Sequence, residues 1–429
     1  MIMNTKELRI AIENGKIDNT LTELYGAENV SAQKERYLNA VNEFEKLYGN
    51  IEEVNFYSVS GRSEISGNHT DHNYGKVIAA SIDLDVIAVA AKANGNIITV
   101  ASEGFGTDKV DFESYSEADE KLFGTSASII AGMCKGFKNN GHKVGGFCAY
   151  ATSNVLRGSG LSSSAAFEDM IGNILNYIYN DGKVDNVEIA KLSQYAENVF
   201  FGKPCGLMDQ VACACGGIVA IDFKDPKAPV IEKLDFDVTK AGYNLCIVST
   251  GGNHADLTDD YASVPAEMKS VAAHFGKSVL RELDIETVRK EIPALREKLG
   301  DRAILRAFHF LNENQRVKVQ TDALKSGDLD AFLEGVKASG RSSFCYLQNV
   351  YTTKNISEQG LSLALCLAEG FLADKKAAWR VHGGGFAGTI QAFVPTSDAE
   401  DFRAIMDAAF GEGACIILRV RPRGAIKVI

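Results

Sequence analysis

The chain has 429 residues, of which 45% are hydrophobic and 24% are charged, and its formal net charge is -11 at pH 7. This is the composition of a globular protein of two or three domains with a full hydrophobic core. The acidic balance argues against a nucleic-acid partner, which needs a basic surface. It does not exclude an anionic substrate, because a few local cations can hold one phosphate.

Cysteine usage and the N-terminal segment bear on the compartment. The nine cysteines follow no disulfide framework, and the first residues carry charges where a signal peptide needs an apolar core. No run of about 18 apolar residues is present, so no transmembrane helix and no membrane partner are expected. We therefore expect a cytoplasmic chain with reduced thiols.

Hydrophobic periodicity predicts a mixture of helices and strands. In chain order, the expected elements are helices within 1–50, the clearest at 31–48, strands at 54–60, 77–92 and 97–102, a helix at 125–140, a strand at 146–153, a helix directly after 157–164, a helix at 187–199, strands at 217–223 and 243–249, a mostly helical region from about 260 to 340, and strands at 377–382, 388–394 and 415–420. Because strands and helices do not alternate strictly, we predict an α+β fold with two lobes. Charge and proline cluster over 225–242, which suggests an N-terminal lobe of residues 1–235 and a C-terminal lobe of residues 236–429.

A glycine-serine stretch, L-R-G-S-G-L-S-S-S-A-A, occupies residues 156–166. Gly158 and Gly160 permit a tight turn, and three serines then open a helix. Free N–H groups at a helix start, together with the helix dipole, form an anion site. The alternative is a serine-capped helix after a plain turn. The stretch is not a Walker loop, which requires G-x4-G-K followed by Ser or Thr.

A second polar segment, V-S-G-R-S-E-I-S-G-N-H-T-D-H-N-Y-G, occupies residues 59–75. A strand delivers Arg62, and a turn-rich loop follows it with many short polar groups. Such groups suit the recognition of sugar hydroxyls, each of which donates and accepts hydrogen bonds. The alternative is a polar surface loop. His69 and His72 form an H-x-x-H pair, which is a weak metal signal without a third ligand nearby.

Asp209 lies in G-K-P-C-G-L-M-D-Q, residues 202–210, between apolar runs. A partly buried carboxylate needs a partner, and an arginine is the natural one. An isolated aspartate at such a place is more often a helix cap or a turn residue.

A glycine motif follows R-V-H at residues 383–388, and its letters match G-x-G-x-x-G. A dinucleotide site needs a helix after this motif, whereas a strand is predicted here. A glycine hairpin lying close to a ligand fits the sequence better, because glycine permits close approach. A simple glycine turn is the alternative.

The order of these motifs carries more information than any one of them. An arginine followed by G-x-H-T-D, then G-S-G-L-S-S-S-A-A, C-G-x-M-D-Q and G-G-G-F-x-G resembles the galactokinase branch of the GHMP small-molecule kinases. The match runs from about residue 20 to the C-terminus. It implies a two-lobed GHMP-kinase-like α+β fold that binds a sugar and ATP in the cleft between the lobes, with Mg²⁺ as the metal.

The resemblance also implies roles for individual residues. Asp209 matches the catalytic base, and Arg62 matches the arginine that pairs with it. The phosphate loop corresponds to Gly158, Ser159, Gly160, Leu161, Ser162, Ser163 and Ser164. Ser164 and Glu197 match the magnesium ligands. Sugar-binding positions correspond to Asn68, His69, Asp71, His72 and Tyr261, and the cleft-lining glycine motif corresponds to Gly383, Gly384 and Gly385.

The sugar loop departs from the family pattern G-R-x-N-L-I-G-E-H-T-D-Y-N. Glu64 replaces the Asn, Asn68 replaces the Glu that binds the sugar's 6-hydroxyl, and His72 replaces the Tyr. Asn68 removes a negative charge at its position, and His72 can become cationic. Both changes relax the penalty against a carboxylate at C6 of the sugar, and galacturonate kinases of the superfamily share them.

Three functions remain open from the sequence. The leading one is an ATP-dependent sugar 1-kinase acting on galactose. The second is a kinase for galacturonate or another modified hexose, and the third is a sensor that binds sugar and ATP without chemistry. Retention of Arg62, Asp209 and an intact phosphate loop favours an enzyme. The sequence gives no oligomeric state.

Overall fold

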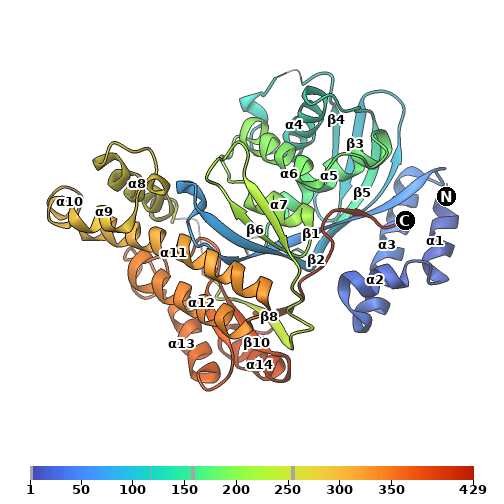
Figure 1. Ribbon diagram of the computed structural model, residues 1–429. Coiled ribbons are helices and arrows are strands. Elements are labelled where there is room, and N and C mark those ends of the chain that lie inside the picture. The colour runs from blue at the N-terminus through green and yellow to red at the C-terminus, as the bar shows by residue number, and fades with distance from the viewer. Residues whose placement is uncertain (1–2, 116, 156–159, 253–256) are drawn as a thin grey trace.

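The protein is described here from a computed structural model that places residues 3–115, 117–155, 160–252 and 257–429. Its larger sheet has eight strands (Figure 1). They are β1 (Val54–Ser66), β2 (Lys76–Lys92), β3 (Ile97–Ser102), β4 (Gly106–Asp111), β5 (Phe147–Ser153), β6 (Ile218–Asp222), β7 (Val230–Leu234) and β12 (Ile426–Lys427). The main order is β12-β1-β2-β5-β3-β4, and β6 joins the other half of β2 and carries β7. All pairs are antiparallel except β3 with β5.

Helices cover both faces of this sheet. One face packs against α1 (Thr5–Glu13), α2 (Asp18–Tyr25) and α3 (Val30–Tyr48), and the other against α4 (Ser126–Asn139), α5 (Ser163–Tyr179), α6 (Asn186–Tyr195) and α7 (Met208–Cys215). In β1, Phe56 stacks on Tyr37 of α3, whereas the neighbouring Tyr57 enters the core on the α4–α7 side. A strand that is buried on both faces needs a nearly continuous apolar sequence, which β1 has at its start.

The second sheet has four antiparallel strands in the order β11-β8-β10-β9. They are β8 (Tyr243–Ser249), β9 (Ala378–Val381), β10 (Thr389–Pro395) and β11 (Cys415–Leu418). One face packs against α13 (Gly360–Leu372) and α14 (Ala399–Phe410). The other face contributes to a core that it shares with the first sheet and with α11 (Asp301–Ser326) and α12 (Leu329–Ser342). This shared core makes the two sheets one packed unit.

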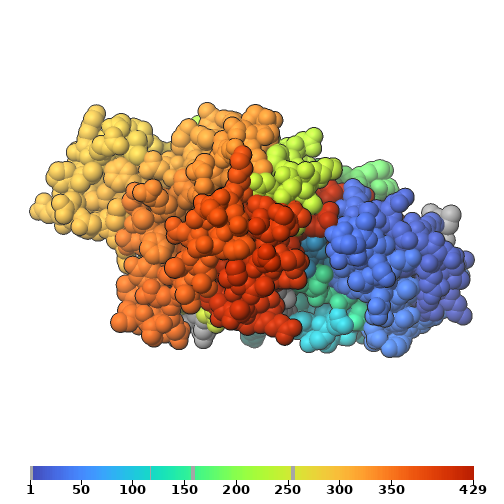
Figure 2. All heavy atoms as spheres, turned by 90° about the horizontal axis from the view of Figure 1, so that it is seen from below, coloured from blue at the N-terminus to red at the C-terminus, as the bar shows by residue number. Residues whose placement is uncertain are grey.

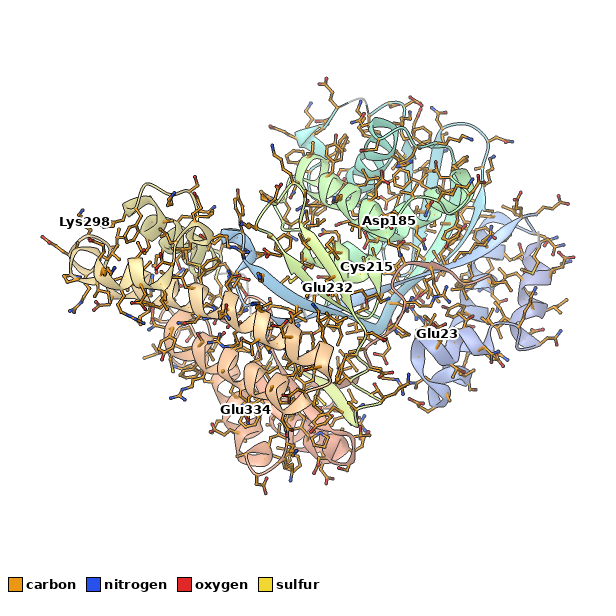
Figure 3. All side chains as sticks on the ribbon, in the orientation of Figure 1. Glu23, Asp185, Cys215, Glu232, Lys298 and Glu334 are labelled. Atoms are coloured by element: carbon orange, nitrogen blue, oxygen red, sulfur yellow. The ribbon has the colours of Figure 1, made fainter. Side chains whose placement is uncertain are left out.

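The helices α8 (Thr258–His274), α9 (Ile285–Lys290) and α10 (Ile292–Leu299) lie at the end of the molecule opposite the N-terminal helices (Figures 1 and 2). Lys298 marks the outer tip of this region in Figure 3. Among the helices described, none is both long and apolar enough to cross a membrane.

Long-range polar contacts join the parts. Glu232 of β7, labelled in Figure 3, pairs with Lys325 of α11 at 2.8 Å. At the other end, β12 returns to the first sheet and pairs with β1. The buried carboxylate of Asp85 accepts hydrogen bonds from Tyr25 and Arg36 of the N-terminal helices and from Arg421 of the C-terminal segment. The N-terminal helices and the C-terminal segment therefore meet at one buried carboxylate of the first sheet.

The predicted α+β fold is confirmed, and the expected strands from 54 to 153 and from 377 to 420 are present. The segment 225–242, predicted as a boundary, contains the edge strand β7, and the chain changes sheet between β7 and β8. The expected helix at 187–199 ends as an α-helix at Tyr195 and continues as a π-helix, Ala196–Phe201.

Candidate active site

Strand β1 is irregular where it carries the polar side chains of the site. Its register with β2 shifts between Ser60 and Arg62 and again between Glu64 and Ser66. Such bulges redirect side chains and often lie beside functional sites. Gly61 sits in the first irregularity, where a Cβ would lie 2.9 Å from the carbonyl oxygen of Leu161. The close approach brings β1 against the segment that leads into α5.

Arg62 and Asp209 form a two-pronged ion pair. The Nε of Arg62 donates to Asp209 Oδ1 at 2.8 Å, and its Nη2 donates to Oδ2 at 2.7 Å. Asp209 stands in the first turn of α7, and 35% of its side chain is exposed against 9% for Arg62. Burial acts to raise the pKa of Asp209, but the charge and hydrogen bonds of Arg62 and the hydroxyl of Ser162 lower it below its ordinary value. The carboxylate is thus ionised and accessible.

The start of α5 lies directly beside this pair. Ser162 has the left-handed conformation, with φ 59°, and its hydroxyl donates to Asp209 Oδ2 at 2.5 Å. The carbonyl of Gly160 accepts from Arg62. Ser163 and the exposed Ser164 open the helix, whose free N–H groups and dipole favour an anion. Of the predicted phosphate loop, Gly160, Leu161, Ser162, Ser163 and Ser164 are described here, whereas Gly158 and Ser159 lie outside the described residues.

The sugar loop places Asp71 beside Gly206, just before the start of α7. A Cβ on Gly206 would lie 2.8 Å from the carboxylate of Asp71, so this glycine allows the carboxylate to approach. Asp71, His72 and Gly206 line a pocket of about 300 Å³. His72 is half exposed, with its Nε2 3.8 Å from Asp71.

Side chains bind three successive carbonyls of the glycine motif. Asn68 donates to Gly383 O at 2.6 Å, His69 to Gly384 O at 2.8 Å, and Tyr261 to Gly385 O at 2.7 Å. Burial lowers the pKa of His69, so the ring is neutral and its Nε2 carries the proton. The structure thus joins the predicted sugar loop, the predicted tyrosine and the predicted glycine motif in one contact set.

Asn68 is fully buried, and its amide is satisfied within the protein. Its Nδ2 also donates to Glu64 at 3.2 Å, while its Oδ1 accepts from Ser343 at 3.2 Å and from Asn349 at 2.8 Å. In this arrangement the amide of Asn68 anchors the loop.

Glu197 occupies the π-helix that follows α6, and its side chain is 4% exposed. Its two oxygens accept from Lys203 at 2.8 Å and from Gln210 at 2.8 Å. Gln210 also donates to the buried Glu168 at 3.1 Å. The Lys203 side chain is 61% exposed, so Glu197 holds an exposed cationic side chain at the site.

The chemistry of Glu197 and Ser164 fits their predicted role as Mg²⁺ ligands. A buried carboxylate that already pairs with an ammonium, and a helix-start hydroxyl from Ser164, are both hard oxygen donors, and Mg²⁺ is commonly held by one or two such groups plus phosphate and water. No group of three or more metal-binding side chains occurs in the described part of the chain. The side-chain oxygens of Glu197 are hydrogen-bonded to Lys203 and Gln210 instead of to Ser164.

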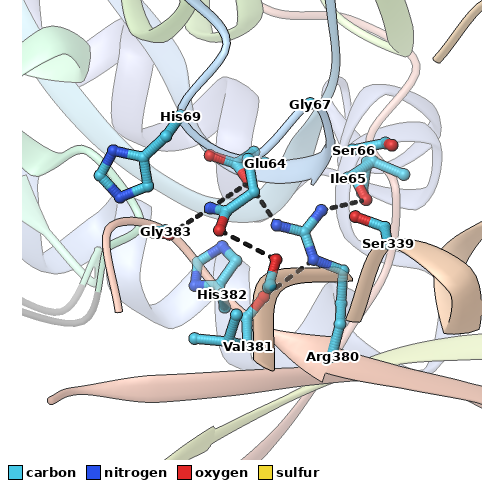
Figure 4. Close-up of polar contacts among 12 residues, drawn as sticks. Glu64, Ile65, Ser66, Gly67, His69, Ser339, Arg380, Val381, His382 and Gly383 are labelled. Carbon is cyan, nitrogen blue, oxygen red and sulfur yellow. Dashed lines mark hydrogen bonds and ion pairs between the residues drawn. The ribbon is translucent and has the colours of Figure 1, made fainter. Parts of the chain in front are cut away.

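Sequence reasoning missed a buried polar set between β1 and the second sheet (Figure 4). Arg380 of β9 donates to Glu64 at 2.5 Å and to the carbonyl of Ile65 at 3.0 Å. His382 contacts Ser63 at 3.1 Å, and burial lowers its pKa to about 3. The R-V-H letters before the glycine motif were the available signal, but their partners lie more than 300 residues away.

Residues 42–92 match the galactokinase galactose-binding signature, and residues 128–217 match the GHMP kinases N terminal domain. The chain is 31% identical to a galactokinase of Clostridium tetani over 84% of this chain and 89% of the relative. It is 32% identical to a galactokinase of Lactobacillus helveticus over 80% and 86%, respectively.

Solved structures show the same fold. The Lactococcus lactis galactokinase complexed with galactose superposes with a TM-score of 0.75 at 24% identity, covering 91% of this chain and 100% of that one. A mevalonate kinase superposes with a TM-score of 0.60 at 13% identity, covering 85% and 98%. From the sequence relatives and the shared fold together, the chain belongs to the galactokinase family of the GHMP kinases.

Proposed function

We propose that the protein transfers the γ-phosphoryl group of ATP to the 1-hydroxyl of galactose. The observation that supports this most directly is the accessible, ionised carboxylate of Asp209, held by Arg62 beside the start of α5. A proton acceptor next to an anion site is what phosphoryl transfer to a hydroxyl requires.

In this proposal Asp209 accepts the proton of the sugar hydroxyl as the new phosphate ester forms. Arg62 keeps the carboxylate ionised and oriented, and Ser162 fixes one of its oxygens. The N–H groups at the start of α5 bind the phosphates of ATP, with Ser163 and Ser164 adding hydroxyl donors. Ser164 and Glu197 would hold Mg²⁺, which would supply charge neutralisation at the phosphates.

In this proposal the sugar binds in the pocket that Asp71, His72 and Gly206 line. Asp71, beside Gly206, contacts a ring hydroxyl, and His69 and His72 lie on the same loop. Tyr261 packs against Gly384, where a Cβ would lie 2.2 Å from the tyrosine ring. In this proposal it bounds the site on the side of the glycine motif. Asn68 acts by holding the loop to the glycine motif.

All nine cysteines are free thiols in the structure. Free thiols in this number are typical of a reducing compartment. This supports our proposal that the enzyme acts in the cytoplasm.

The proposal is tested by ADP release with ATP and Mg²⁺ against galactose, galacturonate, glucose, N-acetylgalactosamine and arabinose. We expect turnover of galactose. Turnover of galacturonate alone would mean that the substrate is an acidic sugar and not galactose. No turnover, with ATP binding still reported by the fluorescence of Trp379, would point to a sensor.

Asp209→Asn tests the base. We expect kcat to fall about 10²–10⁴-fold, because the amide no longer accepts the proton, while ATP binding by calorimetry stays within about twofold. Asp330→Asn is the control, since it also removes a paired carboxylate, at the exposed contact with Lys376. Unchanged kcat in Asp209→Asn would remove Asp209 from the base role.

A further inference from the structure

Two departures of the sugar loop from the family pattern contact each other. The pattern has an amide at the position of Glu64 and a carboxylate at the position of Asn68, and here the two groups are reversed. Asn68 Nδ2 donates to Glu64 Oε1 at 3.2 Å. We propose that these departures are a single compensated exchange. The carboxylate and the amide have traded positions across the hydrogen bond that joins them, and the pair sets sugar specificity as a unit. The inference rests on the proposed sugar kinase function.

The exchanged carboxylate has a dedicated counter-ion. Arg380 is fully buried, and its guanidinium reaches from β9 to Glu64 at 2.5 Å (Figure 4). Its other donors are bound by the carbonyls of Ile65 and Val381. A buried guanidinium without a carboxylate is costly, so Glu64 and Arg380 depend on each other.

The exchanged amide suits its new position equally. The carbonyl of Gly383 faces Asn68 Nδ2 at 2.6 Å and needs a donor, which a carboxylate at position 68 would not provide. Asn349 and Ser343 donate to the amide oxygen. Asn68 therefore links the loop to the glycine motif, while Glu64 supplies the negative charge.

The loop consequently keeps its negative charge, at Glu64. This revises the expectation, drawn from Asn68 alone, that the loop tolerates a carboxylate at C6 of the sugar. Glu64 and Asp209 are each paired with one guanidinium, Arg380 and Arg62, and Asp71 is the carboxylate that lines the pocket beside Gly206. A sugar carboxylate would enter an already anionic surrounding, and like charges in a binding site cost several kcal/mol. The exchange therefore assigns this site to a neutral hexose, and we expect kcat/KM for galactose to exceed that for galacturonate by at least about 100-fold.

A four-member cycle tests the exchange: wild type, Glu64→Asn, Asn68→Glu and the double variant. We expect each single variant to lose about 100-fold in kcat/KM for galactose, mainly through the sugar KM, because one leaves Arg380 unpaired and the other sets two carboxylates against each other. The double variant again holds one carboxylate and one amide, so it should recover to within about tenfold of wild type, and the remaining loss reflects the carbonyl of Gly383, which no longer has a donor at position 68. Independent effects would instead multiply to a loss of about 10⁴-fold, and that result would overturn the exchange.

Thermal unfolding of the same four proteins decides the question without turnover. A lowered Tm in both single variants and recovery in the double variant supports the exchange, and additive losses contradict it. If wild type is stable but turns over no sugar, the proposed function fails while the unfolding cycle still gives its answer.

Glu64→Gln is a milder, nearly isosteric variant for the case that a single variant does not fold. We expect it to raise the sugar KM about tenfold and to leave the ATP KM unchanged. Glu28→Gln, at the exposed pair with Arg419, is the control. Equal changes in both KM values would indicate general disruption and contradict a specificity role.

Discussion

Arg62 acts in two opposing ways on the carboxylate of Asp209, the proposed base. Its charge keeps Asp209 ionised, which a proton acceptor needs, and the same charge makes that carboxylate a weak base. In a loose phosphoryl-transfer transition state the attacking hydroxyl loses its proton late, when it has become more acidic. A weak but permanently ionised acceptor fits this timing. The orientation that the two hydrogen bonds of Arg62 give to the Asp209 carboxylate therefore matters more than its basicity.

Replacing Arg62 should therefore move the acidic limb of the pH profile. In Arg62→Gln the burial of Asp209 remains while the compensating charge is lost, so its pKa rises and protonation inactivates the enzyme at higher pH. We expect the acidic limb of kcat to shift toward neutrality, together with a lower maximum. The measurement is kcat from about pH 5 to pH 8 for both proteins. An acidic limb at the same pH in both would mean that Arg62 does not set the protonation of Asp209.

Among the structural elements, the glycine turn between β9 and β10 is the most tightly constrained. Gly385 has φ 79°, and a Cβ there would lie 2.0 Å from the carbonyl oxygen of Asn349. The motif therefore needs glycine for space as well as for conformation. Its carbonyls are also the points at which the sugar loop and Tyr261 attach.

Gly385→Ala separates these two requirements when compared with Gly413→Ala. Gly413 has φ 78° and open space around the missing Cβ, so its replacement should cost only the conformational term of about 1–2 kcal/mol. Gly385→Ala should cost more and should also raise the sugar KM, because the carbonyls of the turn move. Thermal unfolding and steady-state kinetics measure both. Equal losses in the two variants, with an unchanged KM, would contradict this account.

The same elements show what sequence could and could not predict. Periodicity predicted the strand that leads to Arg62 and the helix that opens at Ser163, because their apolar patterns are regular. It did not predict α7, which carries Asp209. It missed β7, whose exposed Val230 and neighbouring charges suit an edge strand and resemble a linker. It also missed the pairing of Glu64 with Arg380, since no local pattern joins residues on two different sheets.

At the scale of the molecule, buried polar groups tie the two sheets together. His309 of α11 donates to the carbonyl of Asn68, and His382 contacts Ser63 of β1. Burial lowers the pKa of both rings to about 3, so both are neutral in the folded protein. The unfolded chain binds these protons below about pH 6.5, hence stability is fully present above that pH and is lost as the pH falls toward about 3.

Acidification should therefore lower the free energy of unfolding of the protein. As the pH falls from about 6.5 to 5, each histidine should lower the free energy of unfolding by about 2 kcal/mol. His309→Gln should reduce the pH dependence by that amount. Ser342→Ala, which removes the hydroxyl partner of His309, should lower stability at both pH values and keep the slope. Denaturant unfolding at the two pH values measures this, and an unchanged slope in His309→Gln would contradict it.

The return of β12 to β1 has a consequence for biosynthesis. During translation the first sheet emerges early, yet its edge at Tyr57 and Ser58 stays unpaired until Ile426 and Lys427 leave the ribosome. The buried carboxylate of Asp85 likewise lacks Arg421 until then. A nascent chain of residues 1–235 thus carries an open strand edge and an undercompensated buried charge, and it reaches its final packing only once residues 421–427 have been made.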